Sequence, residues 1–286
     1  MKLAAEAPAK INRELRVGRL REDGYHEVHS RMVSIDLADR ITVETGPDLE
    51  LVCDDPAVPA GEGNLVVKAA RRLARAAAIS PRACIRLEKR TPTGGGLGGG
   101  SADAAVALRL LAALWRCAPE VLSSLPAIAG ELGSDVPFFL VGGQADVRGR
   151  GEIVQQVDDA PARELLLLVP PFSISTAAVY RAHAGRGRLS GRLDVEDPAR
   201  REFLGPNDLT PAVLQVEPRM EAYLASAARV SEEHAVSGSG STIVLAARPG
   251  AQADLARRHP EAKLFSCTTL TRDAYRLRTN PNGGSS

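Results

Sequence analysis

A run of glycines directly ahead of an apolar segment constrains this chain more than any other feature. Residues 94–100 read GGGLGGG, and alanines and leucines then dominate as far as Trp115. The preceding residues 83–90, ACIRLEKR, alternate in polarity as a strand does. A flexible spacer would continue in glycine, serine or proline, whereas this run meets a helical pattern from about Ala102. The sequence therefore predicts a structured strand-to-helix loop.

Such a loop is suited to binding phosphate. Glycines permit positive φ angles and let an anion approach the backbone N–H groups. We expect Ser101 to be the N-cap of the helix, whose first turn carries the positive end of the dipole. A Walker A loop requires a Gly-Lys dipeptide, which the chain lacks. Gly94, Gly96 and Gly99 match G-x-G-x-x-G, but a dinucleotide fold normally begins with that pattern, so it is a distant alternative.

Length and charge limit the remaining possibilities. With 286 residues, 44% of them apolar, we predict two domains, residues 1–155 and 156–286, with a disordered tail from about residue 279. Thirty-six basic residues nearly balance 35 acidic ones, which favours a small-molecule partner over nucleic acid. Four scattered cysteines and no apolar run near the ~18 residues of a membrane span favour a soluble, cytoplasmic protein without membrane association. Monomer and homodimer both remain open.

The rest of the chain shows a mixture of strand and helix patterns. Strands are expected at residues 30–45 with a polar break at Asp39 and Arg40, near residue 50, and at 163–171; a helix at 64–79; a surface loop at 182–203; and a glycine-serine turn leading into a strand at 234–247.

Three motifs occur in an order typical of one superfamily. They are APAKIN at residues 7–12, PTGGGLGGGSADAA at 92–105 and VSGSGST at 236–242. Together they resemble the signatures of the GHMP kinases, named for galactokinase, homoserine kinase, mevalonate kinase and phosphomevalonate kinase. Within it the chain most resembles the family of 4-diphosphocytidyl-2-C-methyl-D-erythritol kinases. Further segments carry this closer resemblance: DGYHE at 23–27, LGSDVPFFLVGG at 132–143, GRGE at 149–152 and PNDL at 206–209.

The resemblance, which spans residues 7 to about 245, implies a two-domain α/β (α+β) fold. The N-terminal domain would be similar to domain 2 of ribosomal protein S5, and the C-terminal domain would be ferredoxin-like. The implied reaction transfers the γ-phosphoryl group of ATP to the 2-hydroxyl of the methylerythritol moiety, in the non-mevalonate route to isoprenoid precursors. Mg²⁺ is implied with ATP; Asp103 is a candidate ligand, unless it serves only the helix dipole.

Two residues match the catalytic positions of the family. Asp135 would accept the proton of the hydroxyl group, and Lys10 would stabilise charge on the transferring phosphoryl group. The structural alternatives are a helix-capping aspartate and an exposed, solvated lysine.

Other matched residues would bind the two substrates. Tyr25 and His26 would hold the cytosine by stacking and hydrogen bonding, although lone surface aromatics are common, and HEVH lacks the HExxH spacing of a metal site. Lys89 would reach ATP or would simply be a strand-edge lysine. The remaining substrate positions are Asn12, Gly238, Ser239 and Gly240. The remaining ATP positions are Asn64 and Leu65 beside adenine, and Gly94, Gly95, Gly96, Leu97, Gly98, Gly99, Gly100 and Ser101 around the phosphates.

The chain departs from the family pattern at a few positions. Arg13 and Glu14 place charge on a strand expected to be half-buried, and Ala102 stands where serine is usual. Two other functions stay open: another GHMP kinase acting on homoserine or mevalonate, and a GHMP-fold protein that binds a ligand without catalysis.

Overall fold

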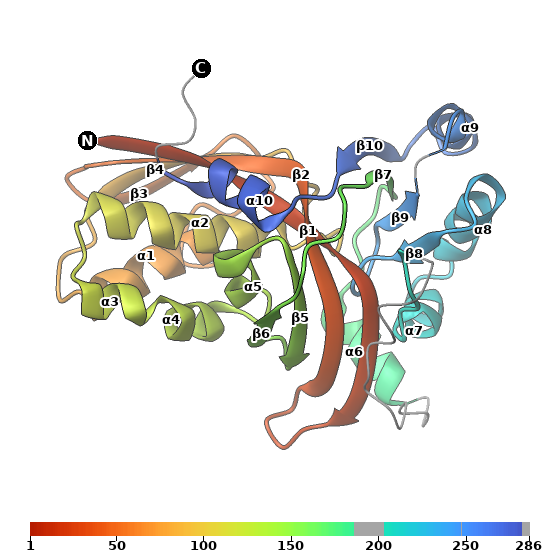
Figure 1. The fold of residues 1–286 in the computed structure, drawn as a ribbon, viewed down its shortest axis with the longest axis horizontal. Helices are drawn as coiled ribbons and strands as arrows, with labels where there is room; N and C mark the ends of the chain where they lie inside the picture. Colours follow the sequence, from red (N-terminus) through yellow and green to blue (C-terminus); the bar gives the residue numbers. More distant parts are fainter. Residues whose placement is uncertain (186–202, 247, 282–286) are drawn as a thin grey trace.

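The protein forms two β-sheets with helices packed against them, as the computed structural model describes for residues 1–185, 203–246 and 248–281 (Figure 1). The first sheet has the order β3-β4-β2-β5-β6, with β1 paired to β2, and the second has the order β10-β7-β9-β8. The strands are β1 (Lys2–Leu20), β2 (His26–Glu44), β3 (Leu49–Cys53), β4 (Ala83–Glu88), β5 (Gln144–Gly149), β6 (Ile153–Gln156), β7 (Glu164–Val169), β8 (His234–Val236), β9 (Ile243–Ala246) and β10 (Lys263–Thr268).

Helices cover both sheets, and within the described residues none is long and apolar enough to span a membrane. They are α1 (Leu65–Ala76), α2 (Gly99–Leu114), α3 (Pro119–Ser123), α4 (Leu125–Leu132), α5 (Val136–Val141), α6 (Thr176–Ala184), α7 (Thr210–Val216), α8 (Met220–Val230), α9 (Ala251–Arg258) and α10 (Arg272–Thr279). Most of the surface loop predicted at 182–203, and the end of the predicted tail, lie outside the described residues.

Strands β1 and β2 form an antiparallel ribbon of 19 residues each, which runs from the first sheet alongside the second half of the chain. Strand β2 is longer than predicted and passes through Asp39 and Arg40 without a break. The expected break is wrong because the Asp39 carboxylate accepts the backbone N–H groups of Arg90 and Thr91, at 2.6 and 2.7 Å, and so fits within a continuous strand.

Helix α2 is the centre of the first half. Its alanines and leucines are buried against α1, α5 and the β1–β2 ribbon. The prediction of Ser101 as its N-cap is wrong: Gly98 is the N-cap, with φ +71°, and Ser101 donates its N–H to the Gly98 carbonyl at 3.0 Å. The reason is that Gly98 supplies the left-handed turn, which leaves Gly99 and Gly100 free to form the first helical turn.

The final helix returns from the second sheet to the first. Helix α10 packs on β1, and the fully buried Tyr275 donates its hydroxyl to the Phe139 carbonyl at 2.6 Å. The two sheets are therefore linked at more than one point along the chain. The chain passes from one sheet to the other between Gln156 and Glu164, and the domain boundary near residue 155 stays a prediction.

Gly142 shows how closely this last helix fits. It has φ +66°, and a Cβ there would lie 2.0 Å from the Tyr275 ring. We expect Gly142→Ala to lower the free energy of unfolding by roughly 3 kcal/mol, because backbone strain and overpacking add. Thermal unfolding followed by circular dichroism measures the change.

The matched control is Gly250→Ala. Gly250 has φ +82° with no atom within 4 Å of an added Cβ, so only the backbone strain remains, about 1 kcal/mol. Equal losses in the two variants would show that α10 does not pack as described.

Candidate active site

A buried lysine faces a carboxylate where three distant segments meet. Lys10 lies on β1 beside a register shift, and Asp135 directly precedes α5. Their side chains approach to 3.4 Å from Lys10 Nζ to Asp135 Oδ2, with the lysine 4% and the aspartate 31% exposed. The Asp135 side chain makes no capping hydrogen bond to α5. Lys10 is therefore not a solvated lysine, and Asp135, which occupies the N-cap position of α5, does not cap the helix with its side chain.

The glycine loop also contacts Lys10. The Lys10 backbone N–H donates to the Leu97 carbonyl at 3.0 Å, and Nζ donates to the Gly96 carbonyl at 3.0 Å. Nζ also donates to Asn12 Oδ1 at 2.8 Å, and the Asn12 amide donates to Ser30 at 2.7 Å. One ammonium group is thus fixed by the first motif, the loop and Asp135 together.

The loop itself has the geometry of an anion cradle. Gly94, Gly96 and Gly98 have φ angles of +75°, +76° and +71°. Gly100, in the first turn of α2, is exposed, and a Cβ on it would meet no atom within 4 Å. Helix N-termini with accessible N–H groups bind phosphate well. The phosphates of ATP therefore fit the residues present.

The third motif packs behind the loop. Ser237 Oγ donates to the Gly96 carbonyl at 3.1 Å, and the Thr242 N–H donates to the Gly95 carbonyl at 3.2 Å. A Cβ on Gly96 would lie 2.3 Å from the Ser237 carbonyl oxygen, so only glycine fits at this contact. Ser239 shares a hydrogen bond with Thr176, the first residue of α6.

Tyr25 and His26 lie where the β1–β2 ribbon turns, and His26 belongs to an aromatic cluster with Tyr180 and His183. Tyr25 is 49% exposed, with the Arg150 guanidinium 5.1 Å from its ring centre. His26 is buried, and Nδ1 lies 3.0 Å from the Gly18 carbonyl. The ring centres of His26 and Tyr180 are 5.7 Å apart. Burial and the nearby charge of Asp135 raise the pKa of Tyr180, so its hydroxyl stays protonated.

Tyr180 was missed by the sequence analysis. It lies on α6, about 155 residues after Tyr25, in the segment STAAVYRAH. The only available signal was its rarity, since the chain has just four tyrosines. Its juxtaposition with His26 depends on how α6 packs against the ribbon, which no local pattern specifies.

Lys89 and Asp103 form a buried network with Asp39. The Lys89 ammonium contacts Asp39 and lies 2.8 Å from Asp103, and all three side chains are at most 7% exposed. Burial raises the pKa of Asp103 to about 8, because Lys89 lowers it less than burial and Asp39 raise it. Burial would lower the pKa of Lys89, but the two carboxylates outweigh it and raise the pKa. This network joins β2 and the residue after β4 to the N-terminal part of α2.

The residues predicted beside adenine also have structural contacts. Asn64 caps α1, accepting the Val66 N–H at 2.8 Å, and its amide donates to the Pro59 carbonyl at 2.8 Å. Leu65 is partly buried against the hydrophobic core that α1 and α2 form with the first sheet. Their role in binding adenine stays a prediction.

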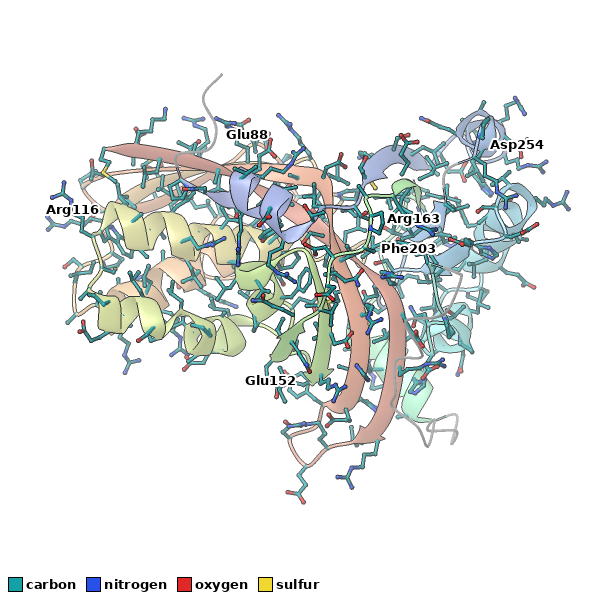
Figure 2. All side chains as sticks on the ribbon, viewed as in Figure 1. Glu88, Arg116, Glu152, Arg163, Phe203 and Asp254 are labelled. Atoms are coloured by element: carbon teal, nitrogen blue, oxygen red, sulfur yellow. The ribbon has the colours of Figure 1, made fainter. Side chains whose placement is uncertain are left out.

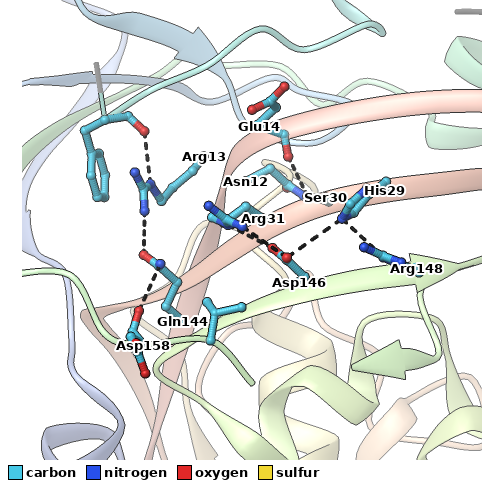
Figure 3. A network of polar contacts seen from close by, with 12 residues as sticks. Asn12, Arg13, Glu14, His29, Ser30, Arg31, Gln144, Asp146, Arg148 and Asp158 are labelled. Atoms are coloured by element: carbon cyan, nitrogen blue, oxygen red, sulfur yellow. Dashed lines mark hydrogen bonds and ion pairs between the residues drawn. The ribbon is translucent and has the colours of Figure 1, made fainter. Parts of the chain in front are cut away.

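A polar network runs from β1 across β2 to β5 (Figure 3). Asp146 accepts two hydrogen bonds from Arg31, at 2.8 and 3.0 Å, and lies 3.9 Å from His29. Burial would raise the pKa of Asp146, but these partners outweigh it and hold the pKa well below its usual range. Arg13 donates to Gln144 at 2.5 Å.

The charges that depart from the family pattern both have specific contacts. The guanidinium groups of Arg13 and Arg163 lie 4.0 and 5.0 Å from the centre of the Phe203 ring, and Figure 2 labels Arg163 and Phe203 next to each other. Glu14 accepts from Arg16 at 2.8 Å. Burial and the nearby charges of Arg31 and Arg163 lower the pKa of Arg13 to about 10, which still leaves it charged at neutral pH. Ala102, the third departure, is buried in α2.

A metal site built from protein side chains is not visible in the described part of the chain, where no three His, Cys, Asp or Glu residues gather. Asp103 is 2% exposed and engaged with Lys89, so it is a poor ligand for Mg²⁺. Asp135 has an accessible carboxylate beside the glycine loop, and such an oxygen suits Mg²⁺ that arrives with ATP.

Known proteins are similar to this chain in sequence and in fold. The family model "GHMP kinases N terminal domain" matches residues 64–143. A protein of Salinibacter ruber (strain DSM 13855 / M31) named 4-diphosphocytidyl-2-C-methyl-D-erythritol kinase is 41% identical over 255 residues, covering 85% of this chain and 89% of its own. The chain belongs to the family of 4-diphosphocytidyl-2-C-methyl-D-erythritol kinases. It is therefore a small-molecule kinase of the GHMP superfamily.

Solved structures of GHMP kinases superpose on this chain. A crystal structure of 4-(cytidine 5'-diphospho)-2C-methyl-D-erythritol kinase superposes with a TM-score of 0.75 at 32% identity, covering 93% of this chain and 98% of that one. A mevalonate kinase from L. major in complex with R-mevalonate gives a TM-score of 0.68 at 15% identity, covering 95% of this chain and 96% of that one, and shows the shared fold alone. The predicted two-domain GHMP kinase fold is confirmed.

The raised pKa of Asp103 predicts an unusual pH dependence. Between its ordinary value of 3.8 and about 8, the folded chain keeps a proton that the unfolded chain has lost. The free energy of unfolding therefore falls as pH rises, by at most about 1.4 kcal/mol per pH unit from this group. Asp103→Asn removes this term, so we expect its stability relative to wild type to increase from pH 5 to pH 8. Urea unfolding at each pH measures it.

Asp254→Asn provides a control of opposite sign. Because hydrogen bonds from Arg258 and Arg257 lower the pKa of Asp254, its contribution to stability is fully present above the ordinary value of 3.8 and is lost as pH falls below it. The relative stability of Asp254→Asn should therefore stay constant from pH 5 to pH 8. Parallel curves for the two variants would contradict the assignment of Asp103.

Proposed function

We propose that this chain transfers the γ-phosphoryl group of ATP to the 2-hydroxyl of 4-diphosphocytidyl-2-C-methyl-D-erythritol, a step of the non-mevalonate route to isoprenoid precursors. The observation that carries the proposal is the position of Lys10. Its ammonium lies between the Asp135 carboxylate and the Gly96 carbonyl of the glycine loop. A donor phosphate at the loop and an acceptor hydroxyl at Asp135 would therefore meet at one cation.

Phosphoryl transfer depends mainly on positioning and charge stabilisation. Asp135 Oδ2 accepts the proton of the acceptor hydroxyl, and the Lys10 ammonium stabilises negative charge on the transferring group. The N–H groups at the start of α2 orient the phosphates. Mg²⁺, when bound with ATP, neutralises phosphate charge. We assign no role in ATP binding to the Lys89 ammonium, because Asp39 and Asp103 already hold it.

The aromatic cluster accounts for the choice of acceptor. Tyr25 offers an exposed ring, and the Tyr180 ring lies on a separate element beside His26. A pyrimidine base has two flat faces and a polar edge, which suit two aromatic rings and an imidazole. We therefore propose that Tyr25, His26 and Tyr180 bind the cytosine. Homoserine and mevalonate have no base to occupy this cluster.

The cysteines support a reducing compartment. All four, at positions 53, 84, 117 and 267, are unpaired. Free thiols persist where glutathione and thioredoxin keep them reduced, so we propose a cytoplasmic location.

The decisive experiment compares acceptors and a variant of the proposed base. We expect ATP-dependent ADP release with 4-diphosphocytidyl-2-C-methyl-D-erythritol and none with homoserine or mevalonate. Asp135→Asn should lower kcat by about 10²–10⁴-fold, the usual contribution of general acid–base catalysis.

Asp254→Asn is the matched control, because Asp254 lies on α9 in ion pairs with Arg257 and Arg258, away from the site (Figure 2). It should keep the wild-type kcat. Turnover with a different acceptor would contradict the substrate assignment, and no turnover with any acceptor would favour a protein that binds its ligand without catalysis.

Tyr25→Ala tests the base contact separately. Since stacking on an aromatic ring contributes about 1–3 kcal/mol per base, KM for the cytidyl acceptor should rise roughly tenfold or more, while KM for ATP stays unchanged. Leu122→Ala, which removes another exposed side chain on α3, should change neither value. An unchanged KM for the acceptor in Tyr25→Ala would remove the tyrosine from the proposed pocket.

A further inference from the structure

A short segment of the second half pairs with the edge of β1 that β2 leaves free. The Leu15 N–H donates to the Pro206 carbonyl at 3.1 Å, and the Asp208 N–H donates to the Leu15 carbonyl at 3.0 Å. Leu15 and Asn207 form a parallel bridge. This pairing begins just beyond Lys10 and Asn12 on the same strand. The segment PNDL, which the sequence analysis identified without assigning a role, therefore lies against the active-site strand.

The Asn207 side chain reaches from this segment to the third motif. Its amide nitrogen donates to the carbonyls of Val236 and Gly238, at 2.8 and 2.7 Å, and its Oδ1 accepts the Leu209 N–H at 2.9 Å. The side chain is buried. Two acceptors on one side and a donor on the other are satisfied by only one orientation of a carboxamide. An aspartate or a leucine of similar shape would leave both carbonyls without a donor.

These two carbonyls flank Ser237, whose hydroxyl supports the Gly96 carbonyl of the phosphate loop. A Cβ on Gly238 would lie 3.3 Å from Asn12 Oδ1 and 3.7 Å from Lys10 Nζ, so the Gly238 backbone lies directly beside the catalytic lysine. A change in the position of Gly238 would therefore displace the Lys10 ammonium group or its partner Asn12.

The residue after Asn207, Asp208, contacts the part of β1 that leads to Tyr25 and His26. The Asp208 carboxylate accepts the Val17 N–H at 3.0 Å and lies 3.4 Å from Arg16 Nη1. The next residue, Gly18, contacts His26 through its carbonyl. The segment is thus connected to His26 through Val17 and Gly18 of β1, and to the surroundings of Lys10 through Gly238.

We propose that Asn207 is a positioning residue, which fixes the Ser237–Gly238 turn so that Lys10 and the phosphate loop are aligned for phosphoryl transfer. This inference rests on the proposed kinase function. The Asn207 side chain is buried and its hydrogen bonds go to backbone groups, so its loss should change the alignment at Lys10 while the groups proposed to bind the substrates remain. The effect should appear in kcat more than in KM.

The test uses Asn207→Asp in the full chain, assayed with ATP and the cytidyl acceptor. Without donors to its two carbonyls the Ser237–Gly238 turn is no longer held beside Lys10, so we expect kcat to fall roughly 10- to 100-fold with both KM values within about threefold of wild type. At lower pH the introduced carboxyl group gains a proton and donates one hydrogen bond again. The ratio of variant to wild-type kcat should therefore rise as pH falls from 8 to 6.

The pH recovery separates this carboxyl group from the charged groups around it, which are Glu14 and Arg16 on β1, Asp208 beside it and Lys10 beyond Gly238. They are present in wild type as well, so their titration cancels in the ratio. Asn207→Ser, whose hydroxyl lies one bond closer to the backbone and so does not reach the two carbonyls, should show a loss of kcat with no recovery at low pH. It also serves as the test if Asn207→Asp does not fold.

Asn280→Asp is the matched control, because it adds the same charge at an exposed position beyond α10 and should keep wild-type kinetics. A folded Asn207→Asp or Asn207→Ser with wild-type kcat would overturn the inference, as would equal changes in kcat and KM without recovery at low pH. A wild-type chain without turnover would instead overturn the proposed function itself.

Discussion

The active site depends on one buried ammonium group. Lys10 is fixed by a neighbouring asparagine, by a carbonyl of the glycine loop and by Asp135, which come from three separate parts of the sequence. A buried charge is tolerated only when its partners are well placed, and removing one partner typically costs about 3–5 kcal/mol. The contacts that compensate for burying the Lys10 charge therefore also connect the first motif, the phosphate loop and the start of α5.

A second buried cation, Lys89, stabilises the glycine loop, which begins shortly after it in the sequence. It connects the strand before the glycine loop to β2 through Asp39, and to the helix after the loop through Asp103. Glycines alone would leave this loop with large conformational entropy. The network fixes both of its ends, and the third motif supports its middle through Ser237 and Thr242. The loop is therefore held in shape without side chains of its own, which leaves its N–H groups available to an anion.

Local patterns in the sequence predicted the elements better than their contacts. The glycine run, the amphipathic α1 and the apolar β7 follow from periodicity and composition, and the motifs identified Lys10 and Asp135 by resemblance. Two errors share a physical cause. Ser101 was expected to cap α2, and Asp39 to interrupt β2, because the isolated residue types favour those roles. In the structure, Gly98 at a positive φ takes the N-cap position, and Asp39 stays within β2 because it accepts the N–H groups of Arg90 and Thr91. Both arrangements depend on how the chain folds back on itself.

The same limit applies to Tyr180 and Asn207, whose importance is invisible until α6 and residues 203–209 are placed against the long ribbon. Their partners lie far away in sequence, so no window of neighbouring residues contains both sides of either contact. The ribbon of β1 and β2 is what brings them together, since one strand carries Lys10, Asn12 and the edge that receives Asn207, and its turn carries Tyr25 and His26. Lys10 lies midway along the ribbon and is buried with several hydrogen-bond partners, whereas Tyr25 lies at the turn and is half exposed. In the proposed function, the ammonium group and the exposed ring are therefore carried at separate positions along one ribbon, so a substitution of Tyr25 can change the contact with the base while the partners of Lys10 remain in place.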